Sequence, residues 1–316
     1  MVSSERWTMW VAGMRVGLAC LRKEPMLGLK RLLLPVSYWR VAEFAYVWRK
    51  LATISTGKVL DVGSPKDLAA ILARDRGFSL TAVDILPEAV SLSDRHTRAQ
   101  GLSGHGAGKV TSEVQDGRAL SYADDTFDAA YSVSVLEHIP DAGDTAALRE
   151  LVRVVKPGGL VVVTVPYDLE YRESFVNESV YERKQIGSEP VFFERHYDEA
   201  TLASRLLGPS GAEVGDIEKW GEPTLPIEGL LVRAGPLRVA ASPLEPCLSG
   251  LFLHRLGPNG KGRPMAAFFS LRKRTMTHFS GTAQKPFAET ASEAAALLHL
   301  ASERARRGRL GDPARG

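Results

Sequence analysis

The sequence predicts an α/β fold with a doubly wound, mostly parallel sheet and helices on both of its faces. Between residues 57 and 164, short β-branched runs alternate with helical patterns, which is typical of βαβ units. The first run ends in an acid and a glycine, and a helix start follows at once. Acidic residues also end or follow the next two runs, at the edge where open α/β sheets bind ligands.

Each element of the first half follows from its periodicity and its flanking residues. Five strands are expected, at 58–62, 79–84, 110–115, 127–133 and 159–165. The helices between them are expected at 65–76, 87–100 and 141–155. The third helix should stop before residues 156–159, because Lys, Pro and two Gly in succession end a helix and turn the chain.

The second half is less regular. Residues 166–195 are expected to form loops and short helices over the sheet, and helical periodicity returns at 198–207. Two strand-like runs, 213–220 and 265–272, would supply the sixth and seventh strands. The connection between them, 221–264, is too long for a structureless loop, so we expect an inserted cap.

The chain is therefore expected to have three parts. Residues 1–56 would form an N-terminal helical extension and 57–275 the α/β domain with its cap. Residues 276–316 would form a C-terminal helix and a tail, and the stretch 304–316, rich in Arg and Gly, is expected to be disordered.

Bulk composition narrows the class of protein. A chain of 316 residues that is 44% hydrophobic can bury a large core, and a net charge of +3 gives no case for a nucleic-acid partner. Cys20 and Cys247 lie far apart without metal-ligand spacing, which favours a reducing cytoplasm and predicts no metal site. No charge-free run approaches the roughly 18 residues of a membrane span, so neither a signal peptide nor a transmembrane helix is expected. The oligomeric state is left open.

The N-terminal extension is basic. Residues 1–56 hold nine Lys or Arg against three Glu, and 35–48 space apolar residues at helical intervals. We expect this helix to pack beside the sheet and help to close a substrate pocket. The alternative is a peripheral contact with a membrane, made by this basic element and the apolar stretch 248–256.

The residues of the turn after the first strand predict how the next helix begins. Ser64 is a good N-cap, Pro65 suits the first helical position, and Asp67 can return the cap, which predicts a capping box. Lys66 could attract the carboxylate of a ligand at this turn, whereas Asp67 would have to point away from it.

This turn resembles the first motif of class I S-adenosylmethionine-dependent methyltransferases, of the small-molecule, methyltransferase type 11-like kind. Asp61 and Gly63 match that motif, but Pro65 and Asp67 stand where the family has its second and third glycines. Further on, 124–140 resembles the family's fourth-strand region, and 156–159 and 193–197 follow in the family's order. The resemblance implies a Rossmann-like sheet of seven strands and S-adenosylmethionine as cofactor.

The resemblance also implies roles for the strand-end acids. Asp61 would orient the methionine amino group, Asp84 would accept hydrogen bonds from both ribose hydroxyls, and Asp116 would accept one from the adenine amine. Asp84 lies 23 residues after Asp61, close to the roughly 20 expected for a ribose acid. The alternative is that these acids cap helices or face water. The other cofactor-binding residues implied are Gly63, Ser64, Lys66, Ile85, Gly117 and Ser132.

Methyl transfer from a sulfonium depends mainly on holding the reacting atoms in line, which is worth up to ~7–11 kcal/mol. A side chain matters where the acceptor must lose a proton, and His138 and His196 are the candidate bases because histidine titrates near neutrality. In the alternative reading, His138 only positions the cofactor wall.

The function expected is methyl transfer to a small or lipid-like acceptor, with oxygen as the methylated atom. The first alternative is a catalytically inactive binding protein on the same fold, which the two missing glycines suggest. The second is a nicotinamide-dependent oxidoreductase, which the acid directly before the turn and the segment 136–139 disfavour. A nucleic-acid methyltransferase is less favoured still, because the chain carries no Asn-Pro-Pro-Tyr-like motif.

Overall fold

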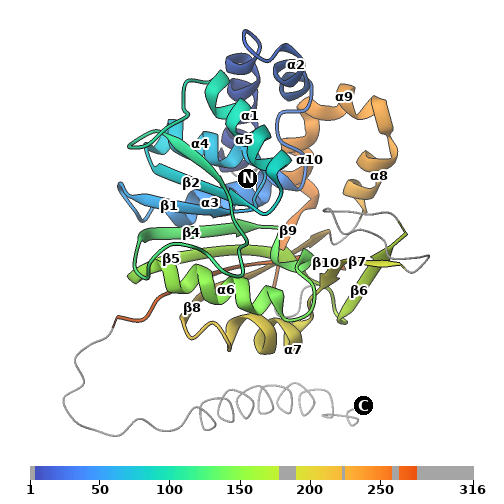
Figure 1. The fold of residues 1–316 in the computed structure, drawn as a ribbon. Helices are drawn as coiled ribbons and strands as arrows, with labels where there is room; N and C mark the ends of the chain where they lie inside the picture. Colours follow the sequence, from blue (N-terminus) through green and yellow to red (C-terminus); the bar gives the residue numbers. More distant parts are fainter. Residues whose placement is uncertain (1–3, 178–189, 223–224, 258–262, 276–316) are drawn as a thin grey trace, which may run out of the picture. The chain divides into compact units, whose positions relative to one another are not determined.

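The computed structural model describes residues 4–177, 190–222, 225–257 and 263–275. In this part of the chain, one sheet has the strand order β3-β2-β1-β4-β5-β10-β8-β9 (Figure 1). Strands β3, β2, β1, β4 and β5 run parallel, whereas β10 is antiparallel to both β5 and β8. The strands are β1 (Lys58–Val62), β2 (Ser79–Asp84), β3 (Val110–Val114), β4 (Phe127–Val133), β5 (Val155–Pro166), β8 (Glu213–Glu222), β9 (His254–Leu256) and β10 (Arg263–Arg272).

The predicted fold class is confirmed, with one strand more than the seven expected. The eighth is β9, a strand of three residues inside the 221–264 insertion that pairs with β8 at the edge of the sheet. Its three residues carry no alternation of apolar and polar side chains long enough to predict a strand. The predicted C-terminal helix and tail, 276–316, lie outside the described residues.

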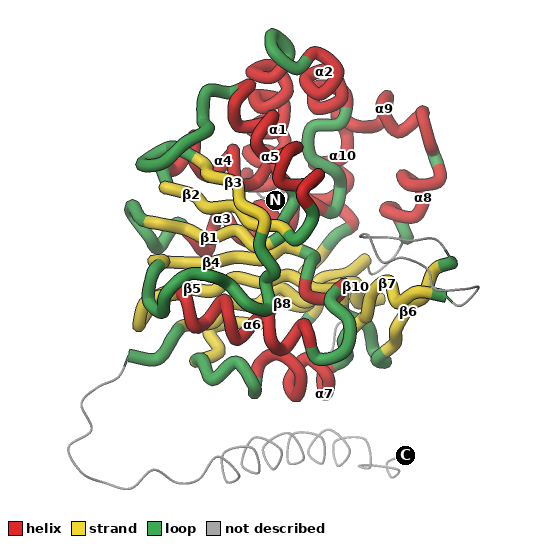
Figure 2. Tube along the Cα trace, viewed as in Figure 1, coloured by secondary structure: helices red, strands yellow, loops and turns green. Residues whose placement is uncertain are grey.

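Helices fill the two faces of this sheet, as Figure 2 shows in red against the yellow strands. Helices α4 (Lys66–Arg76), α5 (Pro87–Ala99) and α6 (Gly143–Val154) connect the parallel strands close to the expected positions. The stop at 156–159 is confirmed as the end of α6, but these residues already belong to β5. The helix expected at 198–207 is a short α7 (Glu199–Thr201) followed by a π-helical turn over Leu202–Leu207.

The expectation of loops and short helices at 166–195 is wrong for the described part of that segment. Strand β6 (Arg172–Val176) pairs antiparallel with β7 (Val191–His196) in a separate two-stranded sheet. Both strands are short and contain charged residues, so their pattern lacked the apolar run that marks a strand. The aromatic pair Phe175 and Phe192, with ring centroids 5.9 Å apart, stabilises the pairing across the two strands.

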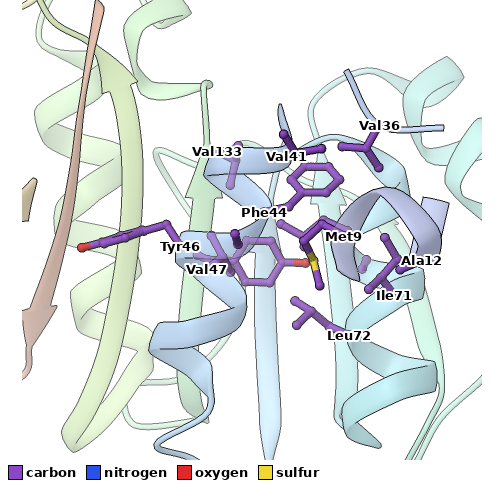
Figure 3. Packing of buried hydrophobic residues seen from close by; sticks show 14 of the residues in the cluster. Met9, Ala12, Val36, Val41, Phe44, Tyr46, Val47, Ile71, Leu72 and Val133 are labelled. Atoms are coloured by element: carbon purple, nitrogen blue, oxygen red, sulfur yellow. The ribbon is translucent and has the colours of Figure 1, made fainter. Parts of the chain in front are cut away.

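The N-terminal extension is helical, as expected, and consists of α1 (Ser4–Cys20), α2 (Pro25–Leu33) and α3 (Arg40–Leu51). Figure 3 shows side chains of this cluster, in which Met9 of α1, Phe44 and Val47 of α3, and Ile71 of α4 are buried together with Val133 of β4. The extension therefore shares one hydrophobic core with the sheet.

Successive strand residues face opposite sides of the sheet, and both sides are buried. Val59 of β1 packs into the core under α1, α3 and α4, whereas Leu60 packs into the core under α6. Both side chains are fully buried, which is why the parallel strands appear in the sequence as continuous apolar runs.

The insertion contains α8 (Ile227–Arg233), α9 (Arg238–Ala241) and α10 (Glu245–Phe252), joined by short 3-10 turns. Buried polar contacts attach it to the extension. Arg6 of α1 donates to the carbonyl oxygen of Leu253 at 3.1 Å, and the carboxylate of Glu245 accepts from the backbone N–H of Tyr38. The insertion is thus fixed to α1 and to the start of α3.

Glycine allows α1 and α2 to cross closely. A Cβ at Gly28 would lie 2.6 Å from the backbone nitrogen of Leu21, so any larger residue must push the two helices apart. We expect Gly28→Ala to lower the free energy of unfolding by about 1–3 kcal/mol, measured by urea denaturation.

The matched control is Gly229→Ala in α8, where the added Cβ would meet nothing within 4 Å. Helix propensity alone then predicts no loss and a gain of up to about 1 kcal/mol. Equal effects of the two substitutions would show that α1 and α2 are not closely packed.

Candidate functional site

A cavity of about 530 Å³ lies at the carboxyl ends of β1, β2, β3 and β4. This is the edge of an open α/β sheet where ligands bind. Seven of the nine predicted cofactor-binding residues line it: Gly63, Ser64, Lys66, Asp84, Ile85, Asp116 and Gly117. Asp61 and Ser132 do not, because both are buried behind the turn.

Asp61 shapes the turn from behind. One of its carboxylate oxygens accepts from the backbone N–H of Ser64 at 3.1 Å, and the other accepts from the hydroxyl of Tyr131 at 3.0 Å. Complete burial raises the pKa of Asp61 to about 6, against the opposing pull of Lys66 and of these hydrogen bonds. Ser132 acts similarly: its hydroxyl donates to the carbonyl oxygen of Val62 at 3.0 Å and joins β4 to the end of β1.

The predicted capping box at Ser64 is wrong. The hydroxyl of Ser64 accepts from the backbone N–H of Val133 at 3.0 Å, and α4 begins only at Lys66 without a side-chain cap. The backbone N–H of Val133 on the neighbouring strand β4 is the donor, in place of an N–H group in the first turn of α4. Gly63 is required on two counts: its φ is +71°, and a Cβ there would lie 2.8 Å from the side chain of Val135.

Asp67 points away from the cavity. It is 3% exposed, and its carboxylate forms an ion pair with Arg31 of α2 at 2.8 Å and contacts His96 of α5 at 3.3 Å. The residue at the family's third glycine position therefore brings no negative charge to the cavity. Its partners lie 36 residues before it and 29 residues after it, so no local pattern predicts them.

The next two acids border the cavity. Asp84 binds the ammonium of Lys66 through one oxygen at 2.5 Å and the backbone N–H of Leu86 through the other at 3.0 Å. Asp116 binds Arg118 through both oxygens, and this contact holds the pKa of Asp116 below its usual range. Between them, the apolar side chain of Ile85 is 53% exposed on the cavity wall. The wall thus offers two carboxylates that flank one flat apolar surface.

A second cavity, of about 870 Å³, adjoins the first and shares Arg40, Ser134 and His138 with it. Its wall comes from β6, β7, α8 and the start of β10, in addition to the 3-10 helix of Leu136–His138. Both candidate bases, His138 and His196, border it.

The two histidines differ in their surroundings. Nδ1 of His138 lies 2.9 Å from the carbonyl oxygen of Phe193, which can only accept, so in the neutral ring the basic nitrogen is Nε2. Both nitrogens of His196 are engaged, with Arg172 at 3.0 Å and with Glu194 at 3.1 Å. Nε2 of His138 lies 3.8 Å from Oε1 of Glu137. Of the two histidines, only His138 borders both cavities.

Strand alternation on β7 places Glu194 and His196 on the cavity side and Arg195 on the buried side. Arg195, 1% exposed, forms an ion pair with Asp144 of α6 at 2.8 Å, and the hydroxyl of Tyr197 donates to the same carboxylate at 2.9 Å. This buried network fixes the strand that carries the cavity wall.

The sequence predicted that the helix of 35–48 helps to close a substrate pocket, but it did not single out Arg40 and Glu43 of α3. Arg40 borders both cavities and binds Glu43 at 2.6 Å, while Glu43 accepts from the hydroxyls of Ser134 and Thr164, each at 2.7 Å. Glu43 is fully buried and joins the extension to the ends of β4 and β5. The only signal was the i, i+3 spacing of Arg40 and Glu43, which is common in exposed helices.

Comparison with known proteins identifies the domain. The family model described as "Methyltransferase domain" matches residues 60–163, which run from β1 to β5 around the first cavity. Residues 60–163 form a methyltransferase domain.

Two curated relatives each match a little over a third of this chain. The 2-methyl-6-phytyl-1,4-hydroquinone methyltransferase of Synechocystis is 39% identical over 120 residues, which are 37% of this chain and 34% of the relative. Methyltransferase GfsG of Streptomyces halstedii is 30% identical over 118 residues, 37% of this chain and 40% of the relative. The chain thus spans little more than a third of either relative.

Among solved structures, coclaurine N-methyltransferase bound to N-methylheliamine and SAH shares the fold with a TM-score of 0.51 and 16% identity. The match covers 74% of this chain and 70% of that one. Within the described residues, no helix has the length and apolar character to cross a membrane, and no group of His, Cys, Asp and Glu is arranged to hold a metal ion.

The raised pKa of Asp61 predicts how the stability of the folded protein depends on pH. Its pKa is about 6 in the folded protein and near 4 in an unfolded chain, so the folded state binds this proton more tightly. Stability is therefore greatest below pH 4 with respect to this group and declines as the pH rises through 6, by at most about 3 kcal/mol.

Asp61→Asn keeps the shape and removes the titration. The free energy of unfolding of the variant relative to the natural protein should rise between pH 4.5 and pH 7.5, measured by urea denaturation at both values. The conservative control is Asp94→Asn on α5, which pairs with Arg98 at the surface and should show no such rise. A constant difference across the pH range would contradict the raised pKa.

Proposed function

We propose that this protein transfers a methyl group from S-adenosylmethionine to a small or lipid-like acceptor. One observation carries the proposal: the first cavity, at the carboxyl edge of a methyltransferase domain, presents Gly63, Asp84 and Asp116 while Asp67 is turned into the core. The second cavity opens directly beside it. The hydroquinone named for the Synechocystis relative supports an acceptor of this kind.

The lining of the first cavity fits the cofactor. Asp84 would accept from the ribose hydroxyls, Asp116 would accept from the adenine amine, and Ile85 would pack against the adenine ring. Lys66 and the N–H groups of the glycine turn would face the methionine end. The cofactor supplies an electrophilic methyl group on a sulfonium, so the protein's part is to hold the acceptor in line with it and to take up a proton.

His138 is the residue proposed to take up that proton. It borders both cavities, its Nδ1 lies beside the carbonyl oxygen of Phe193, and its Nε2 lies 3.8 Å from Oε1 of Glu137. Arg40 and Ser134 share this boundary, and Glu43 fixes both of them. Oxygen is the methylated atom that the sequence resemblance predicts.

The two alternatives make different predictions. An inactive binding protein would bind S-adenosylmethionine or its product without releasing S-adenosylhomocysteine with any acceptor. A nicotinamide-dependent oxidoreductase would bind a reduced nicotinamide nucleotide more tightly than S-adenosylmethionine. Titration calorimetry with these ligands separates the three functions before any acceptor is chosen.

Asp84→Ala should weaken S-adenosylmethionine binding about 10-fold or more, because it removes charge-assisted hydrogen bonds worth about 1.5–3 kcal/mol. Asp94→Ala is the control, since Asp94 lies on α5 and does not border the cavity. Calorimetry on both variants tests the assignment. Unchanged affinity in Asp84→Ala would remove Asp84 from the ribose site.

A further inference from the structure

The deep part of the second cavity is rich in carboxylates. Glu137 and Glu222 border it and are buried, and Glu228 borders it half-buried. Buried Glu43 lies behind Arg40 at the boundary with the first cavity. Arg40 is the half-buried cation among these four carboxylates, while the other arginines of the cavity wall, Arg172, Arg233 and Arg263, are exposed.

Most polar groups of this wall are satisfied, but one carboxyl oxygen is not. Glu222 accepts from the backbone N–H of Glu228 at 3.0 Å, and Glu43 binds two hydroxyls and Arg40. Oε2 of Glu137 has no hydrogen-bond partner in the described part of the chain, although the residue is only 1% exposed. A buried carboxyl oxygen without a donor costs free energy, so it points to a ligand that supplies one.

Burial and neighbouring carboxylates also favour the binding of a cation in this cavity. Burial raises the pKa of Glu137 well above its usual range, and burial together with Glu222 and Glu43 raises the pKa of Glu228 to about 7. Both groups would be stabilised in their ionised form by a cation placed between them and His138.

We propose that the second cavity binds an amine, and that nitrogen is the methylated atom. This inference rests on the proposed function and departs from the oxygen that the sequence resemblance predicts. Carboxylates around a hydroxyl raise its pKa and oppose the loss of the proton that it must give up. An amine attacks through a neutral lone pair and gains positive charge, which the same carboxylates stabilise.

The step balances. An ammonium acceptor first gives one proton to a carboxylate of the cavity and becomes neutral. The nitrogen lone pair then forms the N–C bond as the C–S bond breaks, and the electron pair of that bond stays on sulfur. The product nitrogen carries the positive charge and can lose a further proton to His138 or to Glu137.

The test compares isosteric amines and alcohols on the full chain loaded with S-adenosylhomocysteine. Benzylamine and benzyl alcohol form one pair, 2-phenylethylamine and 2-phenylethanol another. We expect each amine to bind at least about 10-fold more tightly than its alcohol in calorimetry, and Glu137→Gln and Glu228→Gln each to reduce that ratio. Glu170→Gln, at an exposed residue that does not border the cavity, should leave it unchanged.

The outcomes separate the two proposals. Alcohols that bind as tightly as amines, or a ratio that the glutamine variants leave unchanged, would overturn the amine assignment while leaving methyl transfer intact. A protein that fails to bind S-adenosylhomocysteine contradicts the proposed function instead, and the amine ratio measured without it still reports on the cavity. Release of S-adenosylhomocysteine with the amine of a pair and not with its alcohol supports both.

A different observation carries a second proposal, on the outer surface of α1 and α2. Met26, Leu29 and Leu33 follow one another at i, i+3 and i+7 on α2 and are 80%, 47% and 43% exposed. These side chains share one face of the helix, and that face is turned outward. The close crossing at Gly28 holds it in that orientation.

The charge around this face is of one sign. The exposed charged residues between 15 and 33 are Arg15, Arg22, Lys23 and Lys30, and the acid of this stretch, Glu24, is half-buried. The insertion, which packs on α1, also exposes apolar side chains, with Leu237 at 75% and Leu251 at 61% exposure. Leu225 and Val232 of the insertion are exposed and line the second cavity.

We infer that this surface, made by the outward residues of α2, the basic residues between 15 and 30 and the exposed apolar residues of the insertion, docks on an anionic membrane. Exposed apolar side chains beside cations are what a helix lying in a lipid interface requires. The occupant is a lipid surface because the basic charge complements anionic headgroups and the exposed side chains between these cations are apolar.

Sedimentation of the full chain with vesicles tests this. We expect binding to phosphatidylglycerol-containing vesicles, weaker binding to pure phosphatidylcholine, and a further decrease at high salt. Arg22→Gln should weaken binding about fivefold, and the triple variant M26S/L29S/L33S more strongly. Val214→Ser, at an exposed apolar residue on β8, is the control.

Absence of vesicle binding by the full chain would overturn the proposal. So would a dimer in light scattering that the triple variant dissociates, because the surface would then be an interface between two copies. Retained S-adenosylhomocysteine affinity in the triple variant confirms that its fold is intact.

Discussion

The turn between β1 and α4 depends on three buried hydrogen bonds to side chains of two residues, Asp61 and Ser64. Asp61 accepts from the backbone of Ser64 and from the hydroxyl of Tyr131, and Ser64 accepts from the backbone of Val133. These contacts fix the turn from the inside, against β4. The outer side of the turn is therefore left to the cavity, and glycine is needed only at position 63, where φ is positive and Val135 lies close. Positions 65 and 67 can therefore hold Pro and Asp, because the turn requires no glycine at either of them.

The sequence predicted what depends on local pattern. The bounds of β1 and β2 were confirmed because buried parallel strands are continuous apolar runs between clear turns, and the edge where they end holds seven of nine predicted residues. The prediction was wrong where a residue distant in the sequence determines the contact. The Ser64 hydroxyl does not cap α4 because it accepts from the backbone N–H of Val133 on β4, and the buried Asp67 carboxylate pairs with Arg31 and His96. Strands β6 and β7 were missed because each is stabilised mainly by the other.

The N-terminal extension belongs to the site. Helix α3 supplies Arg40 to the boundary of the two cavities, and Glu43 binds the hydroxyls at the ends of β4 and β5. Ser134, one of these partners, has a φ of 51°, a strained conformation for a residue with a side chain. The hydrogen bond to Glu43 offsets part of that cost and holds the backbone beside the first cavity.

The arrangement of polarity in the second cavity gives an orientation to its ligand. Glu137, which carries the unpaired carboxyl oxygen, lies beside His138, whereas Leu225 and Val232 of the insertion and Met265 of β10 supply apolar parts of the wall. Burial is favourable for a ligand only if its polar end meets the carboxyls and its apolar end meets these apolar side chains, because the reverse pose would bury charges against apolar groups. An amphipathic amine would thus enter polar end first, from the side where the exposed apolar surface of the insertion begins. The same geometry places its nitrogen at the boundary with the first cavity, where the methyl group must be delivered.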